Sequence, residues 1–178
     1  TIIKVGANDL GKLPPQAPEL EASVIGALMI EKNAFSNVSD LLHPESFYTD
    51  QHRYIFEAIR SLSAKEAPID LLSVAEQLKA DGKLDLVGGL VYLSELTRRV
   101  ASAAHIRYHA QIIAQKATAR DLITAACQIE EKGYDETQDV DELVEEATAK
   151  IFEISQRSQK REVTPIYNVI SEAFERMQ

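Results

Sequence analysis

The stretch of this sequence that most resembles a catalytic motif is GANDLGKLPP, residues 6–15, which has the spacing of a phosphate-binding loop. Two glycines stand five positions apart, and Lys12 follows the second of them. A working loop needs Ser or Thr after this lysine to hold magnesium, and a helix that opens there so that its backbone N–H groups face the phosphates. Here Leu13 and two prolines follow instead, and proline lacks a backbone donor and disfavours helical geometry in the residue before it. We therefore predict an N-terminal tail over residues 1–18, with no catalytic and no cofactor-binding residue.

His105 and His109 form a second pattern with chemical potential, because two histidines four residues apart share one helix face and can bind a metal. Zinc normally takes a third protein ligand, and the residues between these two lack the glutamate of a zinc metalloprotease. Two surface or interfacial histidines explain the pattern more simply, so we predict no metal site. A small helical metalloenzyme is kept as an alternative, which elemental analysis for stoichiometric metal would decide.

Composition and charge indicate a globular protein that binds neither membranes nor nucleic acid through its whole surface. The longest apolar run containing glycine, VIGALMI at residues 24–30, is far shorter than the ~20 residues of a bilayer-spanning helix. The 178 residues carry a net charge of -9, whereas neutralising phosphates needs a concentrated basic face. Arg98, Arg99 and Arg107 could form a local patch, but such clusters are more often a solvated helix face. We expect a cytoplasmic protein with little direct nucleic-acid binding and no membrane contact.

Residues 19–100 have the pattern of a compact globule of short helices. Apolar residues recur at helical spacing in several segments that turn signals separate. Thr49 and Asp70 precede two of these segments and are typical N-cap residues. The pair Gly88 and Gly89 permits a sharp turn into the last segment, which explains the pair better than a nucleotide loop does.

Two longer helices follow, and together they predict a helical hairpin over residues 101–156. No Pro or Gly interrupts residues 103–132, Gly133 ends the first helix, and Asp139 suits the N-cap of the second. The short loop between the helices requires an antiparallel arrangement. Such an arm exposes more apolar surface than the small globule can cover, so we expect a partner there. The candidate assembly and partner surface consists of Ile112, Leu122, Ile129, Leu143, Ile151 and Ile154.

The C-terminal segment changes character after the hairpin. The stretch RSQKRE has no apolar residue and predicts a polar linker over residues 157–163. Thr164 and Pro165 then give an N-cap and a proline at the first helical position, which open a linker helix over residues 164–178. The one-sided apolar stripe of this helix needs cover, either from its own globule or from a neighbouring molecule. The candidate docking residues are Ile166, Val169, Ile170, Phe174 and Met177.

These segments predict an all-α fold, with a compact helical globule followed by a long antiparallel helical hairpin and a separate C-terminal linker helix. Their motifs also stand in a specific order. KLPPQAPELEASVIGALM opens the set at residues 12–29, and FYTDQHRYIFEAI, PIDLLSVAEQL, LDLVGGLVYLSEL, SAAHIRYHAQII and KIFEIS follow. As an ordered set over about residues 12–155, these motifs resemble bacterial replicative DNA helicases of the DnaB family.

This resemblance implies the non-catalytic N-terminal collar domain of a hexameric replicative helicase, which serves ring assembly and the docking of primase during DNA replication. It implies self-association as a dimer or as a hexamer built as a trimer of dimers. It also implies a linker helix that packs on the motor domain of an adjacent subunit, and a helicase loader is a further candidate partner. ATP and magnesium belong to a separate motor domain that we do not expect in this chain, so we predict that the chain itself is not an enzyme.

A second class of function is a free-standing helical adaptor, including the helicase-binding domain of a primase, which has a related helical globule and hairpin. The order of the motifs favours the helicase. The reading frame after Gln178 would discriminate the two, because a strand followed by a complete phosphate loop would indicate a helicase motor.

Overall fold

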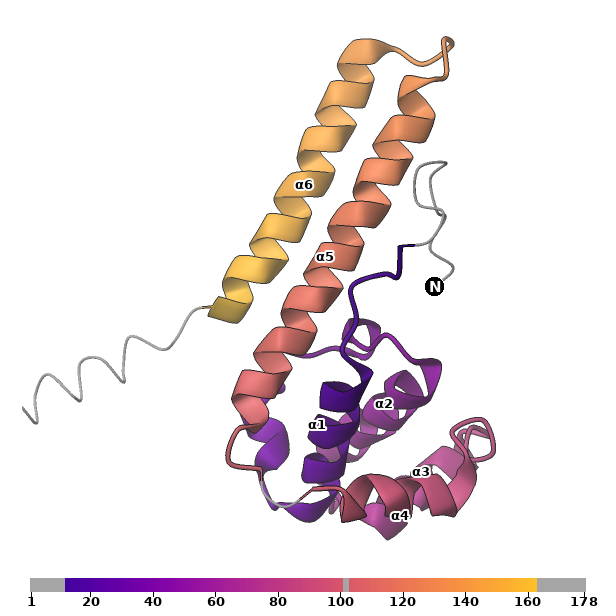
Figure 1. Ribbon diagram of the computed structural model, residues 1–178, viewed down its shortest axis with the longest axis vertical. Coiled ribbons are helices and arrows are strands. Elements are labelled where there is room, and N and C mark those ends of the chain that lie inside the picture. The colour runs from indigo at the N-terminus through magenta and orange to yellow at the C-terminus, as the bar shows by residue number, and fades with distance from the viewer. Residues whose placement is uncertain (1–11, 101–102, 163–178) are drawn as a thin grey trace, which may run out of the picture. The chain divides into compact units, whose positions relative to one another are not determined.

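The computed structural model describes residues 12–100 and 103–162, and within these ranges the chain is helical without strands (Figure 1). The helices of these ranges are α1 (Pro18–Ile30), α2 (Asp50–Ala64), α3 (Leu71–Ala80), α4 (Gly89–Arg98), α5 (Ile106–Gly133) and α6 (Val140–Glu162), with short 3-10 helices η1 (Ala34–Asn37) and η2 (Pro44–Ser46). The all-α prediction is confirmed. The glycines of the phosphate-loop pattern, residue 101 and the whole linker helix over residues 164–178, with Ile166, Val169, Ile170, Phe174 and Met177, lie outside the described residues.

None of the helices in the described ranges combines the length and the apolar character that a membrane crossing requires.

Backbone contacts divide the described residues into two compact units, one that ends at residue 120 and one that begins at residue 121. The first unit is the globule together with the beginning of α5, so its boundary lies inside this helix and not near residue 100 as the sequence suggested. The physical reason is that the chain around the start of α5 contributes to the core of the globule. The buried residues there are Ala103, Ile106, Ala110, Ile113 and Ala114.

The central helix of the globule is α1. Almost all of its side chains between Glu21 and Met29 are buried, as expected for a helix that is covered on every side. It packs against α2, α3 and α4. At Gly26 the backbone of α4 comes so close that a Cβ atom would lie 2.4 Å from the carbonyl oxygen of Leu96. Glycine is therefore required where α1 and α4 meet.

The predicted capping residues open their helices as expected. The Thr49 side chain accepts a hydrogen bond from the N–H of His52, and Asp70 accepts one from Ser73 at 2.9 Å. Gly88 and Gly89 both have positive φ, 95° and 69°, the conformation that other residues adopt only at a cost. The sharp turn into α4 is confirmed, and it depends on both glycines.

Two arginines of α5 fix loops of the globule to this helix. Arg107 forms a two-pronged ion pair with Asp40, at 2.9 and 3.1 Å, and its hydrogen bond lowers the pKa of that carboxyl group. Arg120 donates to the backbone carbonyls of Pro15 and Ser46, at 2.8 and 2.7 Å. The segment before α1 is thus held to α5 by a hydrogen bond to its backbone.

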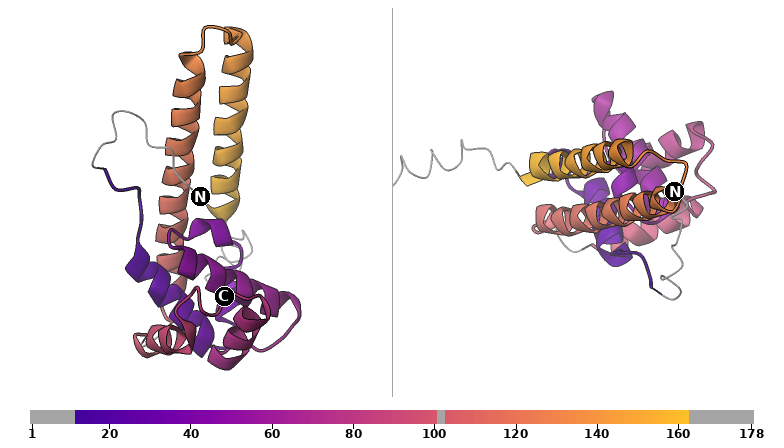
Figure 2. Two further views of the ribbon diagram at one scale, coloured as in Figure 1. Left: turned by 90° about the vertical axis from the view of Figure 1, so that its right-hand side faces the viewer. Right: turned by 90° about the horizontal axis from the view of Figure 1, so that it is seen from above.

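The second unit contains the end of α5, the turn and α6, whose two helices run side by side and antiparallel in both views (Figures 1 and 2). Asp139 caps α6 by accepting from the N–H groups of Asp141 and Glu142, at 2.8 and 3.1 Å, as predicted. The helix continues through Glu162, so the prediction of a non-helical linker from residue 157 was wrong over residues 157–162. The stretch lacks apolar residues but holds mostly good helix formers and no Gly or Pro, so it continues the helix.

Candidate assembly surface

The hairpin has a thin core of its own. Among the described side chains of residues 121–158, only Ala125 and Ile154 are buried. The half-buried residues Ile129, Leu143 and Ala147 line the seam where α5 and α6 face each other. This seam is too narrow to bury the remaining apolar side chains, so the two helices depend on further contacts for much of their stability.

Polar pairs join the two helices along the seam. Lys132 donates to both carboxylate oxygens of Glu146, one at 2.6 Å, and this hydrogen bond lowers the pKa of Glu146. Lys150 donates to the side chain of Gln128. These exposed pairs fix the register of α6 on α5 but add little stability, because water and salt screen them.

A row of apolar side chains runs along one flank of α6, beside the seam. Val140, Val144, Ile151 and Phe152 form this row, which we call the α6 stripe, and their exposed fractions are 72%, 59%, 43% and 63%. Val140, Val144 and Ile151 repeat with the helical period, and Phe152 stands about 100° further round the helix than Ile151, so the four lie within roughly one third of its circumference. A shallow depression beside Ile151 and Phe152 is completed by Ala147, Thr148 and Ser155. Apolar side chains this exposed, in a row on one helix, are typical of a protein interaction site.

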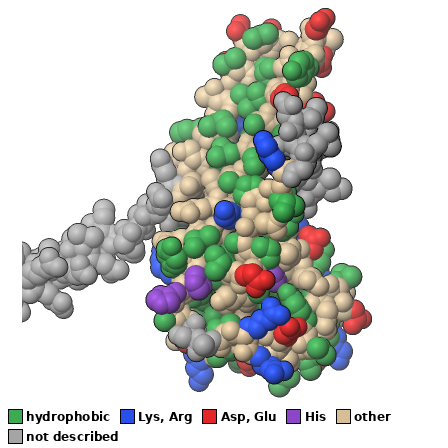
Figure 3. Space-filling view, viewed as in Figure 1, with side chains coloured by type: hydrophobic (Ala, Val, Ile, Leu, Met, Phe, Trp, Pro, Cys, Tyr) green, Lys and Arg blue, Asp and Glu red, His purple; other side chains and the backbone are tan. Residues whose placement is uncertain are grey.

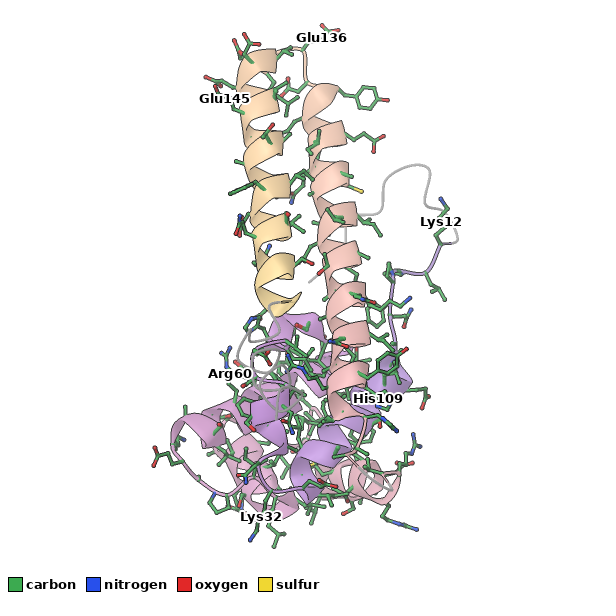
Figure 4. All side chains as sticks on the ribbon, turned by 90° about the vertical axis from the view of Figure 1, so that its left-hand side faces the viewer. Lys12, Lys32, Arg60, His109, Glu136 and Glu145 are labelled. Atoms are coloured by element: carbon green, nitrogen blue, oxygen red, sulfur yellow. The ribbon has the colours of Figure 1, made fainter. Side chains whose placement is uncertain are left out.

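Charge is distributed unevenly along the hairpin. Residues 130–146, which surround the turn, hold nine Asp and Glu residues against one lysine, a net charge of -8. Residues 147–158 hold one glutamate against one lysine and one arginine, a net charge of +1. Glu136 lies at the turn and Glu145 points away from α5 (Figure 4), and acidic side chains gather at this end of the hairpin in the space-filling view (Figure 3). We call residues 130–146 the acidic tip.

The structure places the six candidate residues of the hairpin in different environments. Ile112 is half-buried within the globular unit, Leu122 and Ile151 are exposed, Ile129 and Leu143 lie in the seam, and Ile154 is buried. Only Leu122 and Ile151 therefore offer a free surface within one chain. An intermolecular role for any of the six stays a prediction.

Two strongly exposed aromatic residues of the hairpin are not among these six candidates. Phe152 and Tyr134 are 63% and 82% exposed. Phe152 directly follows Ile151, and two adjacent bulky apolar residues cannot both face the seam. That adjacency was the available signal for a second apolar face.

The histidine pair lies at the start of α5 without further ligands nearby. The rings of His105 and His109 have centroids 6.5 Å apart, with His105 exposed and His109 half-buried. In the part of the chain that the structure describes, no three His, Cys, Asp or Glu side chains gather in a way that could hold a metal ion. The metalloenzyme alternative therefore stays a matter for elemental analysis.

A buried polar network inside the globule was also missed. Glu21 of α1 is 1% exposed, and it accepts hydrogen bonds at 2.8 Å from the N–H of Tyr48 and from Nδ1 of His52. Because a carboxylate only accepts, Nδ1 of His52 is the donor to Glu21, and Nε2 of the same ring is hydrogen-bonded to the Tyr92 hydroxyl at 2.8 Å. Burial raises the pKa of Tyr92. We call Glu21, His52 and Tyr92 the buried triad; it joins α1, α2 and α4.

Comparison with known proteins identifies the relatives of this chain. The family described as DnaB-like helicase N terminal domain matches residues 13–115. The replicative DNA helicase DnaB of Rhodothermus marinus is 41% identical over 168 residues, which cover 94% of this chain and 18% of that protein. The replicative DNA helicase DnaB of Geobacillus stearothermophilus is 35% identical over 167 residues, which cover 94% of this chain and 37% of that protein. The chain thus spans well under half the length of these relatives.

Solved structures agree with this result. The N-terminal domain of DnaB helicase from Mycobacterium tuberculosis is similar with a TM-score of 0.75 at 36% identity, covering 79% of this chain and 99% of that one. A DnaB-like replicative helicase, described together with its interactions with primase, is similar with a TM-score of 0.72 at 25% identity, covering 89% of this chain and 36% of that one. Since the family match spans more than half of the 178 residues, the chain belongs to the DnaB-like helicases and carries their N-terminal domain.

Proposed function

We propose that this chain is the non-catalytic collar of a hexameric replicative DNA helicase, where it holds subunits together and docks primase during DNA replication. The observation that carries the proposal is the α6 stripe, four exposed apolar side chains on a hairpin whose own core contains two buried residues among those described. An isolated hairpin of this kind gains stability when a partner covers the stripe. We further propose that the chain uses no cofactor, since ATP and magnesium would act in a separate motor domain.

Self-association should weaken strongly when charges enter the α6 stripe. The double variant V144E/F152E places two carboxylates where an apolar contact is proposed, so we expect its dissociation constant to rise about thirtyfold or more. Both native side chains are exposed in one chain, so the helix content should not change. Sedimentation equilibrium over a range of concentrations measures the constant directly.

A matched control adds the same two charges to α6 outside the stripe. Ala149 and Gln156 are exposed on this helix and do not belong to the stripe, so A149E/Q156E should associate nearly as the native chain does. Equal weakening in both double variants would mean that added charge alone opposes association. A native chain that stays monomeric at high concentration would contradict the collar role.

Primase docking is the second part of the proposed function. It is supported by the similar helicase whose structure was described with its primase interactions. We expect a primase from the same organism, or its helicase-binding domain, to bind the assembled chain and to bind V144E/F152E less tightly if docking needs the assembled form. Calorimetric titration of the native chain and of V144E/F152E with primase would measure the two affinities. Absence of binding to the native assembly would contradict the docking role.

Two further contacts are proposed on the same basis. The helix over residues 164–178 would pack on the motor domain of an adjacent subunit, and a helicase loader would be a further partner of the assembled collar. The polar and charged end of α6 supports the first of these contacts, because it offers no apolar face on which the following segment could dock within the hairpin.

A further inference from the structure

We propose that the globule carries a docking site of its own, a groove between the ends of α1 and α2 that takes an arginine side chain from an extended segment of a partner protein. The groove has a volume of about 620 Å³, which is within the range of ligand-binding pockets. It shares no residue with the α6 stripe. The inference therefore goes beyond the proposed collar role and does not rest on it.

The last turn of α1 borders the groove with unused backbone acceptors. Residues 28–30 line the groove, and among the described residues no backbone N–H binds their three carbonyl oxygens, because the chain leaves the helix at Glu31. Such free carbonyls make the C-terminal end of a helix electronegative. The helix α2 ends at the same groove, with Ser63 and Glu66 in the lining. Two negative helix ends therefore border one space.

Ionised side chains add to this negative potential. Glu31, Glu66 and Asp70 line the groove against one lysine, Lys32, which gives these four side chains a net charge of -2. Asp70 caps α3, and Glu31 accepts from the N–H of Ala103 at 3.3 Å. Among the described residues of the groove, Glu66 is thus the carboxylate with both oxygens free for a ligand.

Glu66 occupies a backbone position that favours glycine. Its φ is 53°, in the left-handed region, and it stands directly after the C-cap of α2, where many helices end in glycine. Two hydrogen bonds of 3.0 Å fix this ending, from the N–H of Glu66 to Ser63 and from the N–H of Ala67 to Leu62. A residue with a Cβ atom is destabilising there. The chain thus forgoes the more stable glycine and keeps a carboxylate at the groove, as expected for a residue that binds a ligand.

An arginine side chain matches these features better than a smaller cation does. Its guanidinium has five N–H donors and no acceptor, so it can bind a carboxylate and backbone carbonyls at once. Its aliphatic stem can lie on apolar surface, whereas a compact ammonium is strongly hydrated. The groove is larger than one side chain, so residues on either side of the arginine also fit. Its apolar lining for these parts includes Ile30, Phe35, Ala67, Pro68 and Ile69.

Short peptides test whether the chain recognises a guanidinium. The probe is Leu-Arg-Leu-Arg with blocked ends and a neutral fluorophore, and fluorescence anisotropy follows its binding to the full chain. Counterpart peptides replace both arginines with lysine or with citrulline, which has nearly the shape of arginine without the charge. We expect the arginine peptide to bind about fivefold more tightly than the citrulline peptide, and more tightly than the lysine peptide. Equal binding of the arginine peptide and either counterpart would overturn the proposal, as would no binding at all.

Two substitutions of Glu66 test whether the peptide binds in the groove. Glu66→Gln removes the charge and keeps the shape, so it should weaken binding of the arginine peptide about fivefold. Glu66→Gly should weaken binding at least as much, while the midpoint of urea unfolding stays unchanged or rises, because glycine suits the left-handed backbone. A residue with a purely structural role would not combine weaker binding with unchanged or greater stability. Unchanged binding in both variants would overturn the proposal.

Matched controls change the net charge by the same amount outside the groove. Glu76→Gln lies on α3 and Glu145→Gln lies in the acidic tip, and both native side chains are exposed. Both controls should bind the arginine peptide nearly as the native chain does. A control that weakens binding as much as Glu66→Gln would mean that the peptide follows negative charge in general, which overturns the groove as its site. V144E/F152E should bind the peptide like the native chain, so failure of assembly and failure of the groove are measured separately.

Discussion

Replacing Glu21 with leucine is expected to lower the free energy of unfolding of the chain by about 3–5 kcal/mol, the range found when one partner of a buried pair is removed. Glu21 is 1% exposed, and its carboxylate accepts from Tyr48 and His52 at 2.8 Å each. Leucine has a similar volume, so the loss reports the hydrogen bonds and not a cavity. Urea denaturation followed by circular dichroism measures it.

The size of this effect follows from where the donors lie. His52 is itself 3% exposed, so its Nδ1–H has no access to water once Glu21 is gone. The N–H of Tyr48 lies in the turn before α2 and loses its acceptor at the same time. Each buried donor left without a partner costs about 1–3 kcal/mol. Two such donors account for the expected total without any change elsewhere in the globule.

Two further variants separate this mechanism from a general effect on α1. Glu19→Leu removes an exposed carboxylate from the first turn of the same helix and should change stability by about 0.5 kcal/mol or less. Tyr92→Phe removes only the outer hydrogen bond of the buried triad and should cost about 1 kcal/mol. If Glu21→Leu were as mild as Glu19→Leu, the buried triad would not hold the three helices together.

The helices of this chain could be predicted because their signals are local. Thr49, Asp70 and Asp139 each bind backbone N–H groups within three residues of themselves. The glycine pair before α4 likewise acts through its own φ angles. Residues 157–162 were predicted as a linker because they lack apolar residues, but they belong to α6. A lack of apolar residues indicates exposure and says nothing about helix propensity.

The surface of the hairpin could not be predicted to the same degree. Leu143 and Val144 are neighbours in a pattern that is apolar on more than one side, and which of them faces α5 depends on how the two helices pack. The structure puts Leu143 in the seam and leaves Val144 59% exposed. Glu21 and His52 lie 31 residues apart, so their contact is equally a product of tertiary packing.

The position of the charges changes what the net charge of the chain means. Of the total of -9, the acidic tip holds -8, which leaves -1 for the whole of the remaining sequence. Electrostatic repulsion therefore disfavours contact with nucleic acid strongly at the tip and only weakly at the globule. The same concentration of negative charge means that the tip repels acidic surfaces of other molecules more strongly than any other part of the chain does.

The second large effect is expected at Gly26, where substitution by alanine should lower the free energy of unfolding by about 2–3 kcal/mol, as overpacking of a tight core does. The added Cβ would lie 2.4 Å from the Leu96 carbonyl oxygen and 2.6 Å from Cγ2 of Val100. The oxygen belongs to the backbone of α4 and cannot turn aside, so α1 and α4 must separate along their contact. This cost exceeds the gain of about 1 kcal/mol that alanine brings to a helix interior.

Gly133→Ala provides the matched comparison, since a Cβ at this helix end meets nothing within 4 Å and its backbone is not in the left-handed region. The same substitution should there leave stability unchanged or raise it by up to about 1 kcal/mol. Thermal unfolding of both variants beside the native chain therefore tests a difference in sign. If Gly26→Ala were as stable as Gly133→Ala, α1 and α4 would have room to move apart at little cost, and the packing of the globule would not require a glycine at their crossing.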